Sequence, residues 1–216
     1  PPPAGRGAAE RGRPAATPPA AESARAAESP PAAAAEAGAP AAAGGLAQVA
    51  GQARPATGML VSIVLLEPHA EIEVPVPDET PIMDQIGRQF VPGFILVRAG
   101  QTIDFTNSED ELHTVHVKDS HGESIFNIAT MMGTTYQHTF EVGDEYSVIC
   151  NTHTEMFADI MVVDTPYAVV ADRDGRFALP DVIPGLYTAT VIQGGDRSEL
   201  EIEIAAGTNE IDLTGA

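Results

Sequence analysis

From residue 58 onward, short hydrophobic runs alternate with turn residues, and no long helical period interrupts them. Residues 101–106 alternate strictly, which places Ile103 and Phe105 on one face of a strand. Closely spaced runs of this kind are typical of an antiparallel β-sandwich or a Greek-key barrel. Residues 84–90 are expected to form at most a short helical turn. The predicted strands are 61–66, 90–97, 101–106, 112–117, 134–140, 146–149 and 160–163.

A second set of β-type runs follows Pro166, and an Asp-Gly turn at 174–175 divides its first two strands. In residues 199–204, glutamates alternate with Leu and Ile, as in a half-buried strand with one solvated face. About 50 residues are few for an independent core. We therefore expect this module to borrow a strand, and residues 61–66 are the best donor.

The first part of the chain is low in complexity and rich in alanine and proline. Such a segment cannot bury enough apolar surface to offset its ordering entropy, so it is predicted to be a flexible tail that could tether the protein. The expected organisation is a tail at 1–57, a first β-domain at 58–165 and a β-sandwich module at 166–216. Residues 58–67 are candidates to pair with the last module. Because the chain starts at Pro1 rather than at Met, we also expect a processed N-terminus.

Charge narrows the range of partners, because the 216 residues hold 11 Lys and Arg against 31 Asp and Glu, a net charge of −20. This excess of acid repels nucleic-acid phosphates, so nucleic-acid binding is excluded. No apolar run approaches the roughly 18 residues that a membrane-spanning helix needs, so no transmembrane span is expected. The single cysteine, Cys150, is a buried thiol, a reactive thiol or a metal ligand.

The surroundings of Cys150 favour a metal site. Cys150, His153 and Met156 lie three residues apart on one loop between two predicted strands, so their side chains can converge on one soft cation. A fourth ligand comes from His113 or His116, and strand parity places His113 on the inward face. Two imidazoles, one thiolate and a weak thioether suit blue copper, whereas zinc sites do not use methionine.

These motifs resemble those of the cupredoxins over residues 100–164, and the Cys-x2-His-x2-Met loop is similar to that of amicyanin. More broadly, residues 58–216 resemble bacterial periplasmic plastocyanin-like proteins of the methylamine-utilisation type, which add a carboxypeptidase-regulatory-like β-sandwich. The resemblance implies an all-β fold: a cupredoxin Greek-key sandwich plus a smaller β-sandwich. It also implies one type 1 copper, with His113, Cys150 and His153 as strong ligands and Met156 as the axial ligand.

The same resemblance implies a periplasmic, exported electron carrier whose partner is a redox protein, such as a cytochrome c or a membrane-bound electron-transfer complex. One alternative is an accessory subunit docked on a larger complex with a non-essential copper site. Another is copper storage or delivery, although Met131 and Met132 are expected in the core. An enzyme is not expected, because a second cysteine and a Gly-x-Ser-x-Gly motif are both missing. The remaining histidines are expected on the surface: His69, His116, His121 and His138.

Overall fold

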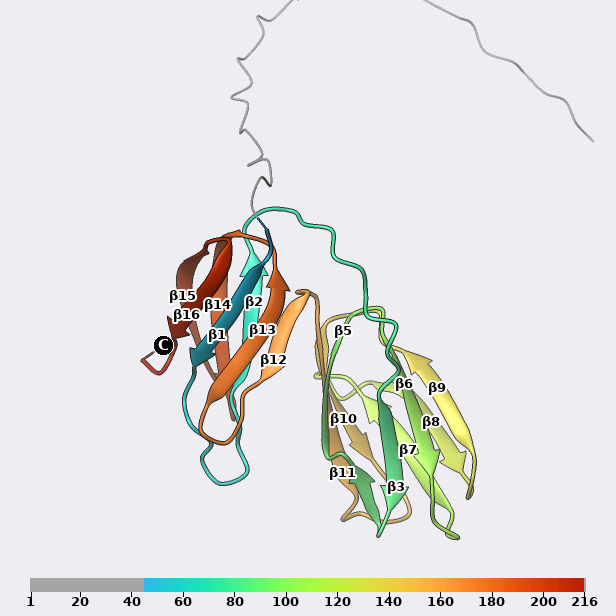
Figure 1. Cartoon of the computed structure of the whole chain (residues 1–216). Coiled ribbons are helices and arrows are strands. Elements are labelled where there is room, and N and C mark those ends of the chain that lie inside the picture. The colour runs from blue at the N-terminus through green and yellow to red at the C-terminus, as the bar shows by residue number, and fades with distance from the viewer. Residues whose placement is uncertain (1–44, 216) are drawn as a thin grey trace, which may run out of the picture. The chain divides into compact units, whose positions relative to one another are not determined.

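A computed structural model describes residues 45–215 of the chain, and these residues form β-strands and no α-helix (Figure 1). The predicted all-β class is therefore confirmed, while residues 1–44 of the tail predicted at 1–57 lie outside the described residues. Within 45–215, no helix has the length and apolarity needed to span a bilayer. The strands are β1 (Ala47–Gln52), β2 (Ile63–Pro68), β3 (Ile82–Ile86), β4 (Gln89–Val91), β5 (Phe94–Arg98), β6 (Thr102–Asn107), β7 (His113–Lys118), β8 (Ser124–Thr130), β9 (Thr135–Thr139), β10 (Asp144–Ile149), β11 (Phe157–Val163), β12 (Tyr167–Val170), β13 (Arg176–Val182), β14 (Gly185–Gln193), β15 (Asp196–Ile204) and β16 (Gly207–Asp212).

Strands β3 to β11 form one sandwich, here called the inserted sandwich because the chain enters it after β2 and leaves it before β12. Its two sheets have the orders β4-β3-β6-β9 and β5-β11-β10-β7-β8. The pairs β3–β6 and β5–β11 are parallel, and the other pairs are antiparallel. Alternating side chains of both sheets bury one apolar core between them, which includes Phe105, Phe140 and Ile160.

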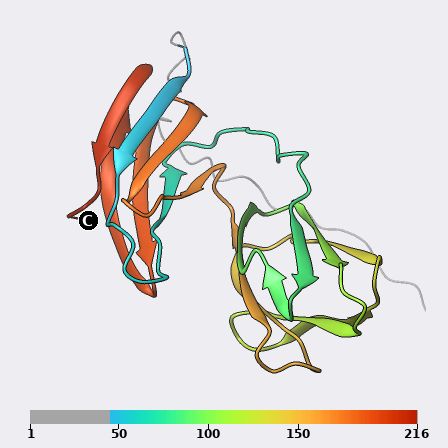
Figure 2. The ribbon, with the colours of Figure 1, turned by 60° about the horizontal axis from the view of Figure 1, so that its bottom comes forward.

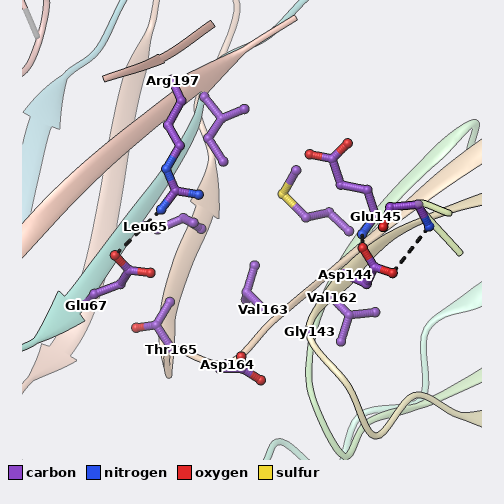
Figure 3. A pocket seen from close by; sticks show the side chains of 13 residues that line it. Leu65, Glu67, Gly143, Asp144, Glu145, Val162, Val163, Asp164, Thr165 and Arg197 are labelled. Atoms are coloured by element: carbon purple, nitrogen blue, oxygen red, sulfur yellow. Dashed lines mark hydrogen bonds and ion pairs between the residues drawn. The ribbon is translucent and has the colours of Figure 1, made fainter. Parts of the chain in front are cut away.

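The remaining strands form a second sandwich, here called the outer sandwich, from sheets β13-β1-β16 and β12-β2-β14-β15. The blue and cyan strands of the early chain lie in it beside the orange and red strands of the C-terminal part (Figure 2). Strand β2 pairs antiparallel with both β12 and β14, and it supplies Val64 and Leu66 to the core. Arg197 on the edge strand β15 lies 3.9 Å from Glu67 on β2 of the same sheet (Figure 3).

Strand β1 corrects the predicted tail, whose last residues are not a flexible spacer. Residues 47–52 form the central strand of a sheet, antiparallel to β13 and parallel to β16. Ala47 and Val49 are buried, and a Cβ atom on Gly51 would come within 2.3 Å of the Ile211 carbonyl oxygen. The strand fits because its side chains are small, which is also why hydrophobicity did not reveal it.

The predicted secondary structure also differs from the observed strands in three other places. Residues 84–90 form no helical turn but belong to strands β3 and β4, joined by a two-residue turn at Gly87 and Arg88. The strand predicted at 90–97 is divided into β4 and β5, because Pro92 cannot donate a ladder hydrogen bond. Strands β8 and β16 were not predicted, since many of their side chains are exposed and their hydrophobic alternation is weak.

Candidate metal centre

Strand β7 positions His113, the first predicted ligand. His113, Val115 and Val117 are completely buried, while His116 lies on the opposite, more exposed face of the strand. The prediction that His113 points inward is confirmed. His116 instead contacts Asn151 Oδ1 through Nδ1 and Ser124 Oγ through Nε2, at 3.1 and 3.0 Å.

The loop between β10 and β11 positions the other three predicted residues. Ile149 pairs with Phe157, so the intervening loop is closed at its base. Within it, the Cys150 N–H donates to the Met156 carbonyl at 3.2 Å, and the Met156 N–H donates to the His153 carbonyl at 3.0 Å. These short turns hold Cys150 and Met156 inside the core of the inserted sandwich, where both are buried.

The structure brings three of the four predicted ligands together. The Nδ1 atoms of His113 and His153 are 3.1 Å apart, and the Cys150 Sγ is 3.9 Å from the Nδ1 of His153. All three ligand atoms lie within 4.8 Å of one another. Bonds of ~2.0 Å to nitrogen and ~2.3 Å to sulfur around one tetrahedral metal would put the nitrogens about 3.3 Å apart and nitrogen and sulfur about 3.5 Å apart. The observed nitrogen–nitrogen separation of 3.1 Å is close to its expected value and the sulfur–nitrogen separation of 3.9 Å is slightly longer than expected, so the three atoms can converge on one metal ion. Met156 lies buried at the end of the same loop, and its axial role stays a prediction.

The environment of Cys150 favours the thiolate, which is the form that binds metals. The Thr114 N–H donates to the sulfur at 3.4 Å, and the Thr114 hydroxyl lies 3.7 Å from it. Burial raises the pKa of the thiol, but these hydrogen bonds and the N–H groups of the loop outweigh burial and lower the pKa from 9.0 to about 6.

Two glutamates that sequence reasoning missed hold the far nitrogens of both imidazoles. Glu109 Oε2 is 2.9 Å from the Nε2 of His113, and Glu111 Oε1 is 3.1 Å from the Nε2 of His153. The Arg88 guanidinium binds both oxygens of Glu111 at 3.0 Å. The backbone N–H of Arg88 lowers the pKa of Glu109, and its guanidinium lowers the pKa of Glu111, so both are carboxylates. The acidic run before His113 was the only sequence signal for them.

The arrangement of donors and acceptors fits a cation at this point. A carboxylate only accepts hydrogen bonds, so a neutral imidazole that faces one carries its proton on Nε2 and keeps a lone pair on Nδ1. Two Nδ1 lone pairs that face each other across 3.1 Å, beside a thiolate, repel one another. A shared metal ion, or a shared proton in the metal-free protein, relieves this repulsion.

A second group of ligand atoms occurs at the other end of β7, where Asp119, His121 and Asp144 also converge within 4.8 Å. Hydrogen bonding within the fold accounts for this group. Asp119 accepts the N–H groups of His121 and Glu123 and thereby closes the turn between β7 and β8. The two oxygens of Asp144 accept the N–H groups of Ser120 and Glu145 (Figure 3).

Apolar side chains are exposed on the loops that adjoin the ligand group. Leu112 directly precedes His113 and is 52% exposed. Met131 and Met132 follow Thr130, which pairs with His113, and are 64% and 59% exposed. The prediction that both methionines belong to the core is therefore wrong. We refer to Leu112, Met131 and Met132 as the apolar patch.

Comparison with known proteins finds no matching family model and no matching curated protein. Among solved structures, the chain is similar to a purple cupredoxin from Nitrosopumilus maritimus, with 20% identity, 38% of this chain, 99% of that chain and a TM-score of 0.35. It is also similar to amicyanin from Paracoccus versutus, with 18% identity over 47% of this chain and 97% of that chain and a TM-score of 0.37. A copper-containing nitrite reductase from Thermus scotoductus is similar as well, with 22% identity over 45% of this chain and 25% of that chain and a TM-score of 0.34. At these identities and TM-scores, the likenesses carry no inference about the chemistry of the site. What the structure itself shows is an all-β fold in which one β-sandwich is inserted into another.

Proposed function

We propose that this protein is a periplasmic type 1 copper protein that carries single electrons to or from a redox partner. The observation that carries the proposal is the convergence of two imidazole Nδ1 atoms and one sulfur within 4.8 Å. These donors come from β7 and from the loop after β10, two segments that the core of the sandwich holds in place. An electron carrier needs ligands that are held in place, because fast electron transfer requires that they rearrange little when the metal changes its oxidation state.

The donor set favours copper over zinc. A thiolate and a thioether suit Cu(I), and imidazoles accommodate both oxidation states of copper. Structural zinc sites use Cys and His without methionine. In the proposed site, His113, Cys150 and His153 would hold the ion strongly, and Met156 would supply a weaker thioether ligand.

A bound copper ion would supply a one-electron couple, and the chain's own residues prepare the site for it. Cys150 and His113 are almost fully buried, so water has little access to the sulfur or to the first imidazole. The lowered pKa of Cys150 means that no large free energy is needed to remove its proton near neutral pH.

We place the contact with the redox partner at the apolar patch. Its residues are exposed. Leu112 directly precedes His113, and the two methionines follow Thr130, the strand partner of His113, so a partner bound there would lie close to the proposed metal site. Apolar contact also avoids the repulsion that a net charge of −20 imposes on an acidic partner. A cytochrome c or a membrane-bound electron-transfer complex fits this role. We propose an electron carrier rather than an enzyme.

Titration of the purified protein with Cu(II) tests the proposal. We expect one equivalent to produce the intense visible band of a copper–thiolate bond, together with a reversible one-electron couple. Cys150→Ser should lose the band, while His116→Ala, which changes a partly buried imidazole on the opposite face of β7 from His113, should keep it. A wild-type protein that binds Cu(II) without this band, or only weakly, would contradict the proposal.

A further inference from the structure

The carboxylate of Glu109 is placed to control the orientation of His113. The imidazole is completely buried, and the Glu109 side chain, with 23% exposure, meets its Nε2 at 2.9 Å. A buried ring has few other groups with which to hydrogen bond, so this contact decides which nitrogen carries the proton. The other nitrogen, Nδ1, then turns its lone pair toward His153 and Cys150.

Glu111 makes the matching contact with His153, and Arg88 holds Glu111 in place. The Nε2 of His153 is 3.1 Å from Glu111 Oε1. Nε and a terminal nitrogen of Arg88 each lie 3.0 Å from a different oxygen of the same carboxylate. A bidentate pair of this kind fixes the plane of the carboxylate as well as its position. Glu111 therefore presents one oxygen to the imidazole at a defined angle.

The turn between β3 and β4 connects the two glutamates. Gly87 and Arg88 have φ angles of 64° and 54°, as a two-residue hairpin turn of the tightest type requires. A residue other than glycine is uncommon at such an angle. At Arg88 this backbone conformation directs the N–H group to Glu109 at 3.0 Å, while the guanidinium of Arg88 binds Glu111. One residue thus supports both carboxylates.

We propose that Glu109 and Glu111 are positioning residues that keep both ligand imidazoles protonated at Nε2, with Nδ1 directed at the metal, and that their negative charges favour the oxidised ion. This inference rests on the proposed function and extends it to the potential of the site. Negative charge next to a ligand stabilises Cu(II) more than Cu(I), because the ion with the higher charge gains more. Outer carboxylates also raise the basicity of the ligand nitrogen.

The first experiment uses the metal-free protein and does not depend on copper. Nitrogen-15 NMR of the imidazole side chains reports which ring nitrogen carries the proton. We expect His113 and His153 to be protonated at Nε2 in the wild-type protein. Glu109→Gln should shift the spectrum of His113 toward a mixture, because an amide can donate as well as accept. Protonation of His113 at Nδ1 alone would overturn the inference.

The second experiment compares affinities for Cu(II) and Cu(I) in the wild-type protein, Glu109→Gln and Glu111→Gln. Glu123→Gln, which removes the same charge at the far end of the β7–β8 hairpin, is the matched control. For each ligand-side variant we expect the ratio of Cu(II) to Cu(I) affinity to fall about tenfold, which raises the potential of a one-electron couple by about 59 mV. The control should stay close to the wild type.

The outcomes separate the two proposals. If the wild-type protein lacks the copper–thiolate band, the proposed function fails. If the band forms but Glu109→Gln and Glu111→Gln have the same potential as Glu123→Gln, the proposed function stands and the inference about the carboxylates is wrong. Glu111→Asp keeps the negative charge, so its potential should lie closer to the wild-type value than that of Glu111→Gln if charge is the cause.

Discussion

The pH dependence of stability tests the environment of Cys150 in the metal-free protein. In the folded protein the thiol has a pKa of about 6, whereas in the unfolded chain it titrates near its ordinary value of 9.0. Between these values the unfolded state binds more protons than the folded state, so stability rises with pH. The contribution is fully present above pH 9 and is lost as the pH falls through about 6.

The size of the effect follows from the same shift. Within the window from pH 6 to 9, each pH unit changes the free energy of unfolding by up to ~1.4 kcal/mol. Near pH 6 the contribution has almost disappeared. Hydrogen bonds from Thr114 are a principal cause of the low pKa, so Thr114→Val should make the dependence shallower.

Urea unfolding at several pH values measures this dependence, with a chelator and a reductant present to keep the protein metal-free and the thiol reduced. The wild-type protein is compared with Cys150→Ser, which has no thiol but the same remaining titratable groups. Their difference in the free energy of unfolding isolates the thiol. As the pH rises from 6 to 9, we expect the free energy of unfolding of the wild type to increase relative to that of Cys150→Ser by about 1 kcal/mol per pH unit. Two parallel pH profiles would refute the reasoning.

Two further substitutions test the fold and the apolar patch. Gly51→Ala should destabilise the protein by about 3 kcal/mol in urea unfolding, because the new Cβ meets the Ile211 carbonyl at 2.3 Å, whereas Gly45→Ala, with nothing within 4 Å, should have little effect. Equal stability of the two variants would mean that β1 is not packed as described. The double variant Met131→Ser and Met132→Ser should keep the spectrum of the copper-loaded protein and slow electron exchange with a cytochrome c about tenfold. Unchanged kinetics would place the partner's contact elsewhere.

The orientation of the predicted ligands could be derived from the sequence, because strand alternation is a local property. His113 lies on the same face as two valines, and this period of two decides which histidine enters the core. The same rule works in β10, where Tyr146 and Val148 are buried and Cys150 continues their face beyond the end of the strand. Neither inference needs knowledge of distant contacts.

Strand β1 could not be predicted, because its contribution to the core depends on small residues. Ala47 and Gly51 carry little hydrophobic signal, and they follow a long stretch of similar composition. What makes residues 47–52 a strand is the space available between β13 and β16, which a larger side chain at Gly51 would not fit. A composition-based boundary therefore falls too late in the chain.

The two glutamates were missed for a different reason. In a chain with a net charge of −20, a solvated glutamate and a glutamate that orients a ligand look the same in the sequence. Arg88, which distinguishes Glu109 and Glu111 from the others, lies 21 and 23 residues before them, in residues 84–90, where at most a short helical turn was expected. Only the hairpin between β3 and β4 brings it to the carboxylates. The proposed ligands are thus indicated by local spacing, whereas the carboxylates that contact them are brought there by a long-range contact that local patterns do not contain.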